Sequence, residues 1–448
     1  MRISIFFFLL VLGACRKENG TEPVPEKPSP DVLEYTPEKM SDGYTLVAPL
    51  NSKNIYLIDK EGFVVKKWEA THLPGPDTWL LPNGQLLRAE KLPNSDFSAG
   101  GSGGRIHLFN WDNTIAWEFD WSTATELQHH DVKQLPNGNF LLTVWEKHGL
   151  SEILERGKIP PSQPLTEMWF DKIMEVKPTG PTSGTVVWEW KSWDHLIQDY
   201  DSSKPNHGNV SQHPERIDIN YNFLLQGGAA NFMHINGVEY VPEYDQIILS
   251  VRNFSEIWII DHSTTTAEAA TGTGGIRGKG GDLLYRWGNA FGYQVGQLSD
   301  RKLFTQHNPT WISNLPNHGG NLLVFNNELE DANGEPFSTI NEIKLPHTNG
   351  NFNLLPSSAL VPSDYAWTYT QQGFYSRHLS SALRFANGNT LMCEGDKGLC
   401  QEITHEGEVV WKYQLPVPQG SLFKALRYAP DYGAFHNKQL ARTGQLVE

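Results

Sequence analysis

The segment from Phe232 to Arg252 carries three side chains that suit the binding of a negatively charged oxygen. A turn is predicted at residues 242–245, between two apolar runs that would pair as antiparallel strands. In such a hairpin His234, Asn236 and Arg252 lie close together at the end opposite the turn. Because an imidazole, a carboxamide and a guanidinium all donate hydrogen bonds, the hairpin predicts an oxyanion site.

Further histidines occupy equivalent positions in a repeat, each shortly before the turn that opens a unit. These residues are His129, His130, His234, His307 and His378. A neutral imidazole is a competent nucleophile near neutral pH, and fixed donors stabilise charge on a transferring group. The alternative is that repetition places similar polar residues at equivalent positions without any chemistry.

Two motifs alternate along the chain and define this repeat. The first is a turn followed by an apolar run, as in Leu81-Pro-Asn-Gly-Gln-Leu-Leu, and it recurs from residues 135, 241, 315 and 385. The second is a strand, a turn and a strand that ends at or near Trp. It spans residues 55–68, 106–119, 173–190, 257–287, 343–369 and 402–413. The six copies of the second motif indicate six structural units.

Each unit holds four predicted strands, which is typical of a β-propeller blade. The first unit lacks its innermost strand, because residues 44–49 already form the second one. Residues 423–431 echo residues 381–388 and would supply that strand, so that no sheet edge stays open. We therefore predict an all-β, six-bladed β-propeller with four-stranded blades, closed by a C-terminal strand. The histidines, at the starts of innermost strands, would ring one mouth of its channel.

Four long irregular stretches are predicted insertions that would form the walls for an aromatic ligand. They lie at about residues 147–172, 191–232, 262–282 and 345–364.

The charge and the N-terminus bound the class of protein. A net charge of −15 without a basic stripe argues against nucleic-acid binding. Residues 1–14 read as a signal peptide, and Leu12-Gly-Ala-Cys15 resembles the bacterial lipobox, in which Cys15 is lipidated. We expect a disordered tether over 15–35, the catalytic propeller over 36–448, and a lipid anchor to the cell envelope, in the periplasm or at the outer membrane. The alternative is an ordinary cleaved signal with an incidental cysteine.

Export leaves Cys393 and Cys400 in a compartment that permits disulfides. If Asp396 and Lys397 form a two-residue turn, the two cysteines face each other across a hairpin and a disulfide is geometrically possible. Two free buried thiols are the alternative.

Four stretches together resemble one family over nearly the whole chain from about residue 36. They are His129-His-Asp-Val with its Pro-Asn-Gly turn, His234-Ile-Asn236, Ser250-Val-Arg252, and Gln306-His307 followed by Gly320-Asn-Leu-Leu-Val-Phe325. The family is the bacterial arylsulfate sulfotransferases, which use no nucleotide sulfate donor. Its members are six-bladed propellers without a cofactor.

The resemblance implies a role for each aligned residue. His307 would be the nucleophile that takes the sulfuryl group from a phenolic sulfate and passes it to a phenolic acceptor, by a ping-pong mechanism through sulfohistidine. His130, His234, Asn236 and Arg252 would bind the sulfuryl oxygens and manage the protons, with His129 as the alternative to His130. Family members with an N-terminal β-sandwich dimerise through it, and there is no room for that domain before residue 36. The oligomeric state is therefore left open, and a monomer is compatible with the sequence.

Two other functions compete with transfer between phenols. A non-catalytic propeller that binds a sulfated or phenolic ligand, or a partner, would explain the fold and the basic mouth, but not the likeness around His307. A metal-dependent hydrolase or lyase could use the rim histidines as ligands. No His-x-His pair occurs at these positions, and Arg252 beside them would repel a cation. Water could also replace the phenolic acceptor, which would make the protein a sulfatase.

Overall fold

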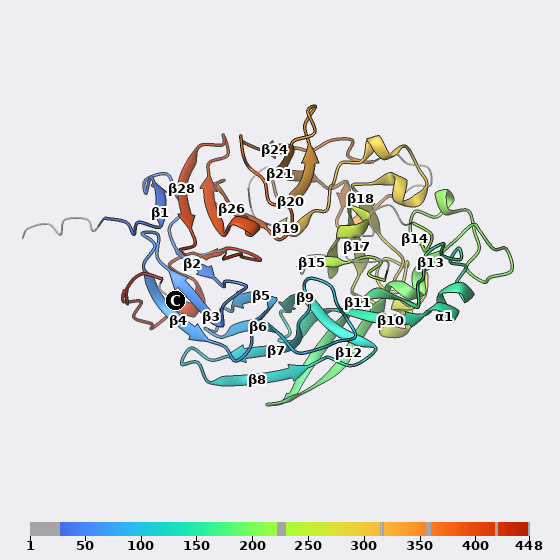
Figure 1. Ribbon diagram of the computed structural model, residues 1–448, viewed down its shortest axis with the longest axis horizontal. Helices are drawn as coiled ribbons and strands as arrows, with labels where there is room; N and C mark the ends of the chain where they lie inside the picture. Colours follow the sequence, from blue (N-terminus) through green and yellow to red (C-terminus); the bar gives the residue numbers. More distant parts are fainter. Residues whose placement is uncertain are drawn as a thin grey trace, which may run out of the picture.

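The computed structural model describes residues 27–446, except 222–229, 314, 316–317, 355–359 and 417–419. Six four-stranded antiparallel blades form a ring, as predicted (Figure 1). Cys15 and the expected signal peptide lie outside the described residues. In the described part of the chain, no helix is both long enough and apolar enough to cross a membrane.

The strands of each blade follow one another from the channel outward, with blade 1 shared between the two ends of the chain. Blade 1 contains β29 (Leu426–Tyr428), β2 (Tyr44–Val47), β3 (Asn54–Ile58) and β4 (Val64–Glu69). Blade 2 contains β5 (Pro74–Leu80), β6 (Leu86–Lys91), β7 (Gly104–Phe109) and β8 (Ile115–Asp120). Blade 3 contains β9 (Glu126–Gln134), β10 (Phe140–Gly149), β11 (Glu167–Gly180) and β12 (Ser183–Lys191).

Blades 4 to 6 follow the same order. Blade 4 contains β15 (Ile235–Val241), β16 (Gln246–Val251), β17 (Glu256–Asp261) and β18 (Tyr285–Trp287). Blade 5 contains β19 (His307–Ile312), β20 (Asn321–Glu330), β21 (Pro336–Lys344) and β24 (Trp367–Tyr369). Blade 6 contains β25 (Ser381–Arg384), β26 (Thr390–Glu394), β27 (Leu399–Ile403), β28 (Val409–Gln414) and, as a fifth strand, β1 (Val32–Tyr35).

Short elements fill the predicted insertions, and Figure 1 shows α1, β13 and β14 projecting to one side of the ring. The helical elements are α1 (Leu150–Glu155), α2 (Thr266–Ala269), η1 (Ser192–His195), η2 (Val210–Gln212), η3 (Arg252–Phe254), η4 (Ala290–Tyr293), η5 (Leu298–Asp300), η6 (Gly395–Lys397) and η7 (Gly433–Phe435). The remaining strands are the parallel pair β13 (Leu196–Ile197) and β14 (Ile217–Asp218), and the hairpin of β22 (His347–Thr348) and β23 (Asn351–Phe352).

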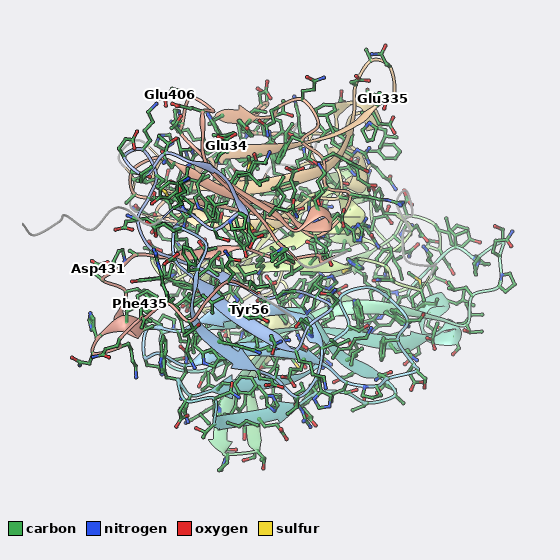
Figure 2. The ribbon with its side chains drawn as sticks, turned by 60° about the vertical axis from the view of Figure 1, so that its left-hand side comes forward. Glu34, Tyr56, Glu335, Glu406, Asp431 and Phe435 are labelled. Atoms are coloured by element: carbon green, nitrogen blue, oxygen red, sulfur yellow. The ribbon has the colours of Figure 1, made fainter. Side chains whose placement is uncertain are left out.

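The ring closes as the sequence predicts, because β29 pairs antiparallel with β2 as the innermost strand of blade 1. After β29, Phe435 packs edge-on against Tyr44 with ring centroids 5.0 Å apart. Figure 2 shows this C-terminal segment on the same side of the molecule as Tyr56 of β3. The predicted end of the tether at residue 35 is too late, since β1 already pairs with β28 and covers the outer edge of blade 6.

The recurring Trp of the second sequence motif ties five of the six blades to the next blade. In five blades its indole N–H donates to a backbone carbonyl of the following blade, at 2.7 to 3.1 Å. The five pairs are Trp117 with Ser183, Trp190 with Gly281, Trp287 with Pro362, Trp367 with His405, and Trp411 with Lys60. In these five blades the repeated Trp therefore marks the blade interface, where the neighbouring blade satisfies its only donor.

Cys393 and Cys400 occupy directly opposite positions of β26 and β27. Both are fully buried free thiols. The turn between them runs through η6 and is longer than the predicted two residues. The hydrogen bond between the two thiols, together with burial, raises the pKa of Cys393 well above its usual value. The pairing needed for a disulfide is present, and the disulfide itself stays a prediction.

Candidate active site

Three of the predicted site histidines sit on innermost strands at one mouth of the ring: His130 on β9, His234 beside the start of β15, and His307 at the start of β19. In each blade the pairing with the second strand shifts register at or next to the histidine. A β-bulge re-aims side chains that would otherwise alternate between two faces. The bulges therefore allow the three imidazoles to converge.

Unusual backbone conformations accompany these bulges. His130, His234 and Asn308 have φ angles of 46°, 56° and 50°. For residues other than glycine, this left-handed region costs on the order of 1 kcal/mol or more each. Such strain persists only where the surroundings hold it, and it gathers here around the histidines.

The converging side chains line a cavity of about 290 Å³. His130, His234, Arg252 and His307 contribute to it, and the other lining residues are Arg377, His378 and Leu379 before β25, and Pro76, Gly100 and Gly101 from blade 2. The prediction that the walls come from the long insertions is wrong for this cavity. Residues on the innermost strands, and residues that precede or connect blade strands, form the walls instead.

The side chain of His307 is held in one orientation by Asn327 on β20. Oδ1 of Asn327 accepts from Nδ1 of His307 at 2.8 Å, while Nδ2 of Asn327 donates to the carbonyls of Ser376 and Leu379 at 2.9 and 3.0 Å. These carbonyls fix the direction of the carboxamide, so His307 carries its proton on Nδ1 and keeps a lone pair on Nε2. No motif in the sequence points to Asn327, although it lies two residues after the Gly320–Phe325 stretch.

Burial keeps the site imidazoles neutral. Burial and the charge of Arg252 lower the pKa of His307 to about 3. Burial also lowers the pKa of His130 and of His234 well below the ordinary value, and neighbouring imidazoles and Arg252 add to the effect. A neutral imidazole with a free Nε2 is the form that can act as a nucleophile.

His234 and His130 lie beside each other, with ring centroids 4.6 Å apart. Nδ2 of Asn231 donates to Nδ1 of His234 at 2.7 Å, so His234 presents an N–H at Nε2. Nδ1 of His130 lies 2.8 Å from Nδ1 of His129. His129 itself is fully buried and does not line the cavity, so His130 is the member of the pair that faces a ligand.

Gly101 of blade 2 packs directly on His130. A Cβ atom at Gly101 would lie 2.0 Å from Cε1 of His130, and the φ angle of Gly101 is 86°. The carbonyl of Gly101 also accepts from the backbone N–H of His130 at 2.8 Å. Only glycine fits at this position, which brings the blade 2 backbone to the edge of the cavity.

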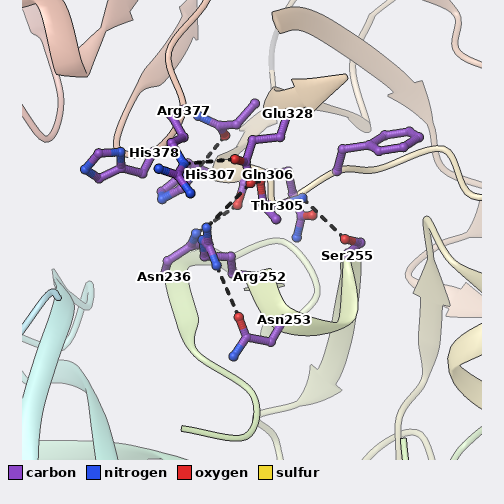
Figure 3. Close-up of polar contacts among 12 residues, drawn as sticks. Asn236, Arg252, Asn253, Ser255, Thr305, Gln306, His307, Glu328, Arg377 and His378 are labelled. Carbon is purple, nitrogen blue, oxygen red and sulfur yellow. Dashed lines mark hydrogen bonds and ion pairs between the residues drawn. The ribbon is translucent and has the colours of Figure 1, made fainter. Parts of the chain in front are cut away.

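Arg252 is the buried cation of the cavity. Its Nη1 donates to Oδ1 of Asn253 at 3.2 Å, and its Nη2 lies 3.8 Å from Oε2 of Glu328 (Figure 3). Glu328 also accepts from Thr305 at 3.0 Å and from Nε of Arg377 at 3.2 Å. The carboxylate partly balances two guanidinium groups, and the guanidinium of Arg377 is the exposed one.

Asn236 lies beneath the cavity and does not line it, contrary to its predicted contact with the ligand. Its Nδ2 donates to the backbone carbonyl of Gln306 at 2.8 Å, and the hydroxyl of Ser250 donates to the same carbonyl at 3.1 Å. Because Gln306 directly precedes His307, Asn236 fixes the backbone that carries the imidazole (Figure 3). A short side chain on the bulged strand reaches the neighbouring blade before it reaches the cavity.

His378 lines the outer part of the cavity and pairs with Asp396 at 3.0 Å. Within the described residues, no three His, Cys, Asp or Glu side chains are arranged to hold a metal ion. The predicted residues thus come together around the cavity in two groups: His130, His234, Arg252 and His307 face it, and Asn236 supports it.

A family model described as Arylsulfotransferase (ASST) matches residues 31–422. No curated protein matches the chain significantly. Among solved structures, a Bacteroides caccae protein of unknown function has 12% identity and a TM-score of 0.46, covering 86% of this chain and 99% of that chain. The β-propeller domain of Cps50 (Swd1) from Myceliophteria thermophila has 11% identity and a TM-score of 0.43, covering 90% and 97%.

Proposed function

The chain belongs to the arylsulfotransferase family, and on this premise we propose that it transfers sulfuryl groups between phenols by a ping-pong mechanism through a sulfohistidine at His307. Family membership makes the protein an aryl sulfotransferase that uses phenolic donors and acceptors. The covalent intermediate and the roles of individual residues are the proposal.

One observation carries the proposal: the His307 imidazole is neutral, fixed by Asn327 and open at Nε2 within a cavity that also contains Arg252. A group that only positions a ligand gains nothing from an exposed lone pair next to a cation. A nucleophile that attacks an anionic sulfate ester needs both features, because the cation offsets the repulsion of the anion.

In the first half-reaction, Nε2 of His307 attacks the sulfur of the phenolic sulfate. The sulfur–nitrogen bond forms, the bond between sulfur and the aryl oxygen breaks, and the phenol leaves with a proton. In the second, the oxygen of an acceptor phenol attacks the same sulfur, the sulfur–nitrogen bond breaks and the acceptor loses its proton. His307 is regenerated, and no oxidant or reductant is needed.

Arg252 and His234 bind the sulfuryl oxygens in this mechanism. Arg252 supplies a buried guanidinium, and His234 supplies the N–H at Nε2 that its contact with Asn231 enforces. Fixed donors that face the developing charge stabilise a transition state without having to reorganise. His130 remains for the proton steps.

The test is the release of nitrophenol from 4-nitrophenyl sulfate by the purified protein in EDTA, with and without added phenol. We expect release that rises steeply with phenol, together with the formation of phenyl sulfate. Equal release in both conditions would make the protein a hydrolase. Absence of nitrophenol release and of phenyl sulfate in both conditions would contradict the proposal and favour a non-catalytic propeller.

We further propose that the protein is exported and anchored to the bacterial cell envelope by a lipid on Cys15, in the periplasm or at the outer membrane. The support is the lipobox-like sequence Leu12-Gly-Ala-Cys15. Membrane fractions of cells that express the Cys15→Ala variant should lose the protein to the soluble fraction. An unchanged membrane share would contradict the lipid anchor.

A further inference from the structure

Three of the four imidazoles that line the cavity, those of His307, His234 and His130, differ in what stands behind them. His307 is backed by the carboxamide of Asn327, and His234 by that of Asn231. A carboxamide neither takes up nor gives up a proton near neutral pH, so it fixes the tautomer of the imidazole. His130 is backed by a second imidazole, at 2.8 Å between the two Nδ1 atoms, so its tautomer can change.

Behind this second imidazole lies a buried carboxyl group. Nε2 of His129 is 3.0 Å from Oδ1 of Asp171 on β11, which is within reach of a hydrogen bond, although the angles of this contact do not form one in the described part of the chain. The ring of His129 stacks on Trp145, with centroids 4.1 Å apart and planes within 8°, so it cannot turn away. Asp171 is held in turn by the backbone N–H of Ile235, which donates to the same Oδ1 at 3.1 Å. His129 and Asp171 are both buried, whereas His130 lines the cavity.

We propose that Asp171, His129 and His130 form a proton relay in which the carboxyl group of Asp171 stores the proton that His130 gives to the leaving phenol and recovers from the acceptor phenol. This inference rests on the proposed function, and it deepens it by assigning the proton steps to His130. Asp171 and His129 act through His130 and are positioning residues.

The relay has two protonation states that differ by one proton. In the loaded state, Asp171 is a neutral acid that donates to Nε2 of His129, Nδ1–H of His129 donates to Nδ1 of His130, and His130 presents an N–H at Nε2. In the unloaded state, Asp171 is a carboxylate that accepts from Nε2–H of His129, Nδ1–H of His130 donates to Nδ1 of His129, and Nε2 of His130 presents a lone pair. Both imidazoles stay neutral in both states.

The environment agrees with this distribution of charge. Burial lowers the pKa of His129 and of His130 and raises that of Asp171 well above the usual value of a carboxyl group. Oδ2 of Asp171 has no hydrogen-bond partner in the described part of the chain, so a carboxylate there is poorly satisfied. A proton therefore belongs on Asp171 in the resting enzyme, which is the loaded state.

The reaction uses the two states in turn. As the bond between sulfur and the aryl oxygen breaks, Nε2–H of His130 protonates that oxygen and the relay becomes unloaded. When the acceptor phenol attacks the sulfohistidine, Nε2 of His130 takes its proton and the relay is loaded again. Each half-reaction thus leaves the relay in the state that the other half requires.

The test compares two donors that differ in their need for a proton on the leaving oxygen. Phenol has a pKa of about 10 and leaves poorly as an anion, whereas the nitro group of 4-nitrophenol stabilises the anion. Asp171→Asn keeps the size of the side chain but cannot store the proton. We expect it to slow the first half-reaction of phenyl sulfate by about a hundredfold, and that of 4-nitrophenyl sulfate by less than about threefold.

Asp131→Asn is the matched control, because Asp131 is also buried and also accepts a backbone N–H, from Val238 at 2.7 Å, but it pairs with Lys424. It should change the rates of both donors by the same factor. His129→Gln interrupts the relay from its middle and should repeat the selective loss of Asp171→Asn. Thermal melting shows whether each variant is folded.

Two negative results are distinguishable. If the wild-type protein transfers no sulfuryl group from either donor, the proposed function fails and the relay fails with it. If the wild-type protein transfers but folded Asp171→Asn and His129→Gln slow both donors equally, the relay is wrong and the proposed function stands.

Discussion

Buried titratable groups occur in two regions of this molecule, between the blades and at the channel mouth. The regions differ in how completely protein partners bind the polar atoms of these groups. Between blades 5 and 6, Glu342 accepts from Asn321 at 2.6 Å and pairs with Arg384 at 3.0 Å. Glu402 is held in the same way by Asn389 and by Arg427 of blade 1. Each carboxylate has an amide from its own turn and a guanidinium from the next blade.

At the channel mouth, protein partners bind only one ring nitrogen of the site imidazoles and leave the other directed to the cavity. The imidazole of His307 has a partner at Nδ1 through Asn327 and keeps Nε2 for the cavity, and His234 is arranged alike through Asn231. The comparison shows that burial alone does not mark a functional group. A buried group whose outward atom is left for a ligand suits a reaction, whereas a group whose atoms all face protein partners joins two blades.

The largest effect on transfer should follow from removing the nucleophile. His307→Ala should lower turnover by on the order of 10⁴-fold or more, because it removes the Nε2 lone pair that Asn327 fixes beside Arg252. His213→Ala, an exposed histidine outside the cavity that pairs with Glu215, is the control and should be unaffected. Turnover of 4-nitrophenyl sulfate with phenol measures both variants. Near wild-type turnover by His307→Ala would refute the covalent role.

Loss of the buried cation should be the next largest effect. Arg252→Ala removes a donor to the sulfuryl oxygens and should cost about 3 kcal/mol in the transition state, on the order of a hundredfold in rate. Arg252→Lys keeps the charge without the planar fork and should recover part of the loss. Steady-state kinetics with 4-nitrophenyl sulfate provides the comparison. An unchanged kcat in Arg252→Ala would remove this residue from the site.

The pH dependence should separate a fixed carboxamide from a charged partner. The pKa of His307 is lowered to about 3, so the nucleophile stays unprotonated and the first half-reaction should be nearly flat from about pH 7 to about pH 5. Asn327→Asp places an anion beside Nδ1, which raises that pKa and favours the imidazolium as the pH falls. Its single-turnover rate should drop by about tenfold over the same range. A wild-type rate that halves near the ordinary histidine pKa would contradict this picture.

The smallest effect on transfer is expected from a blade-interface pair. Arg427→Met leaves the buried Glu402 without its cation and should lower the free energy of unfolding by about 3–5 kcal/mol. Turnover per folded molecule should stay unchanged, because neither residue lines the cavity. Adding Glu402→Gln should restore much of the lost stability. Urea denaturation followed by Trp fluorescence tests both variants. A loss of kcat in folded Arg427→Met would contradict the separation between the blade interface and the active site.

Most of the fold could be predicted from the sequence, because short motifs of neighbouring residues mark each repeat. The Pro-Asn-Gly turns and the recurring Trp mark each blade, and the similarity of residues 423–431 to residues 381–388 predicts the closure that β29 makes. Even so, the reason for these residues lies in the structure. The Trp donates to the next blade, and Asn389 of a turn binds the glutamate that joins two blades.

The candidate site could be predicted only in part. Strand starts located His130, His234 and His307, but not the bulges that turn them toward the cavity, since a bulge depends on the register of two strands. Asn327 and Asp171 lie on other strands of their blades and approach the histidines only in three dimensions. No spacing in the sequence reveals such contacts.

The most direct test of the central claim is a rapid-quench experiment with 4-nitrophenyl sulfate that carries ³⁵S, without an acceptor. A sulfohistidine at His307 predicts a burst of nitrophenol matched by one label for each protein molecule. Peptide mapping should locate the label on His307, and added phenol should discharge it. Steady release of nitrophenol in the presence of phenol with no protein-bound label at any time would contradict the sulfohistidine and point to direct transfer between the two phenols.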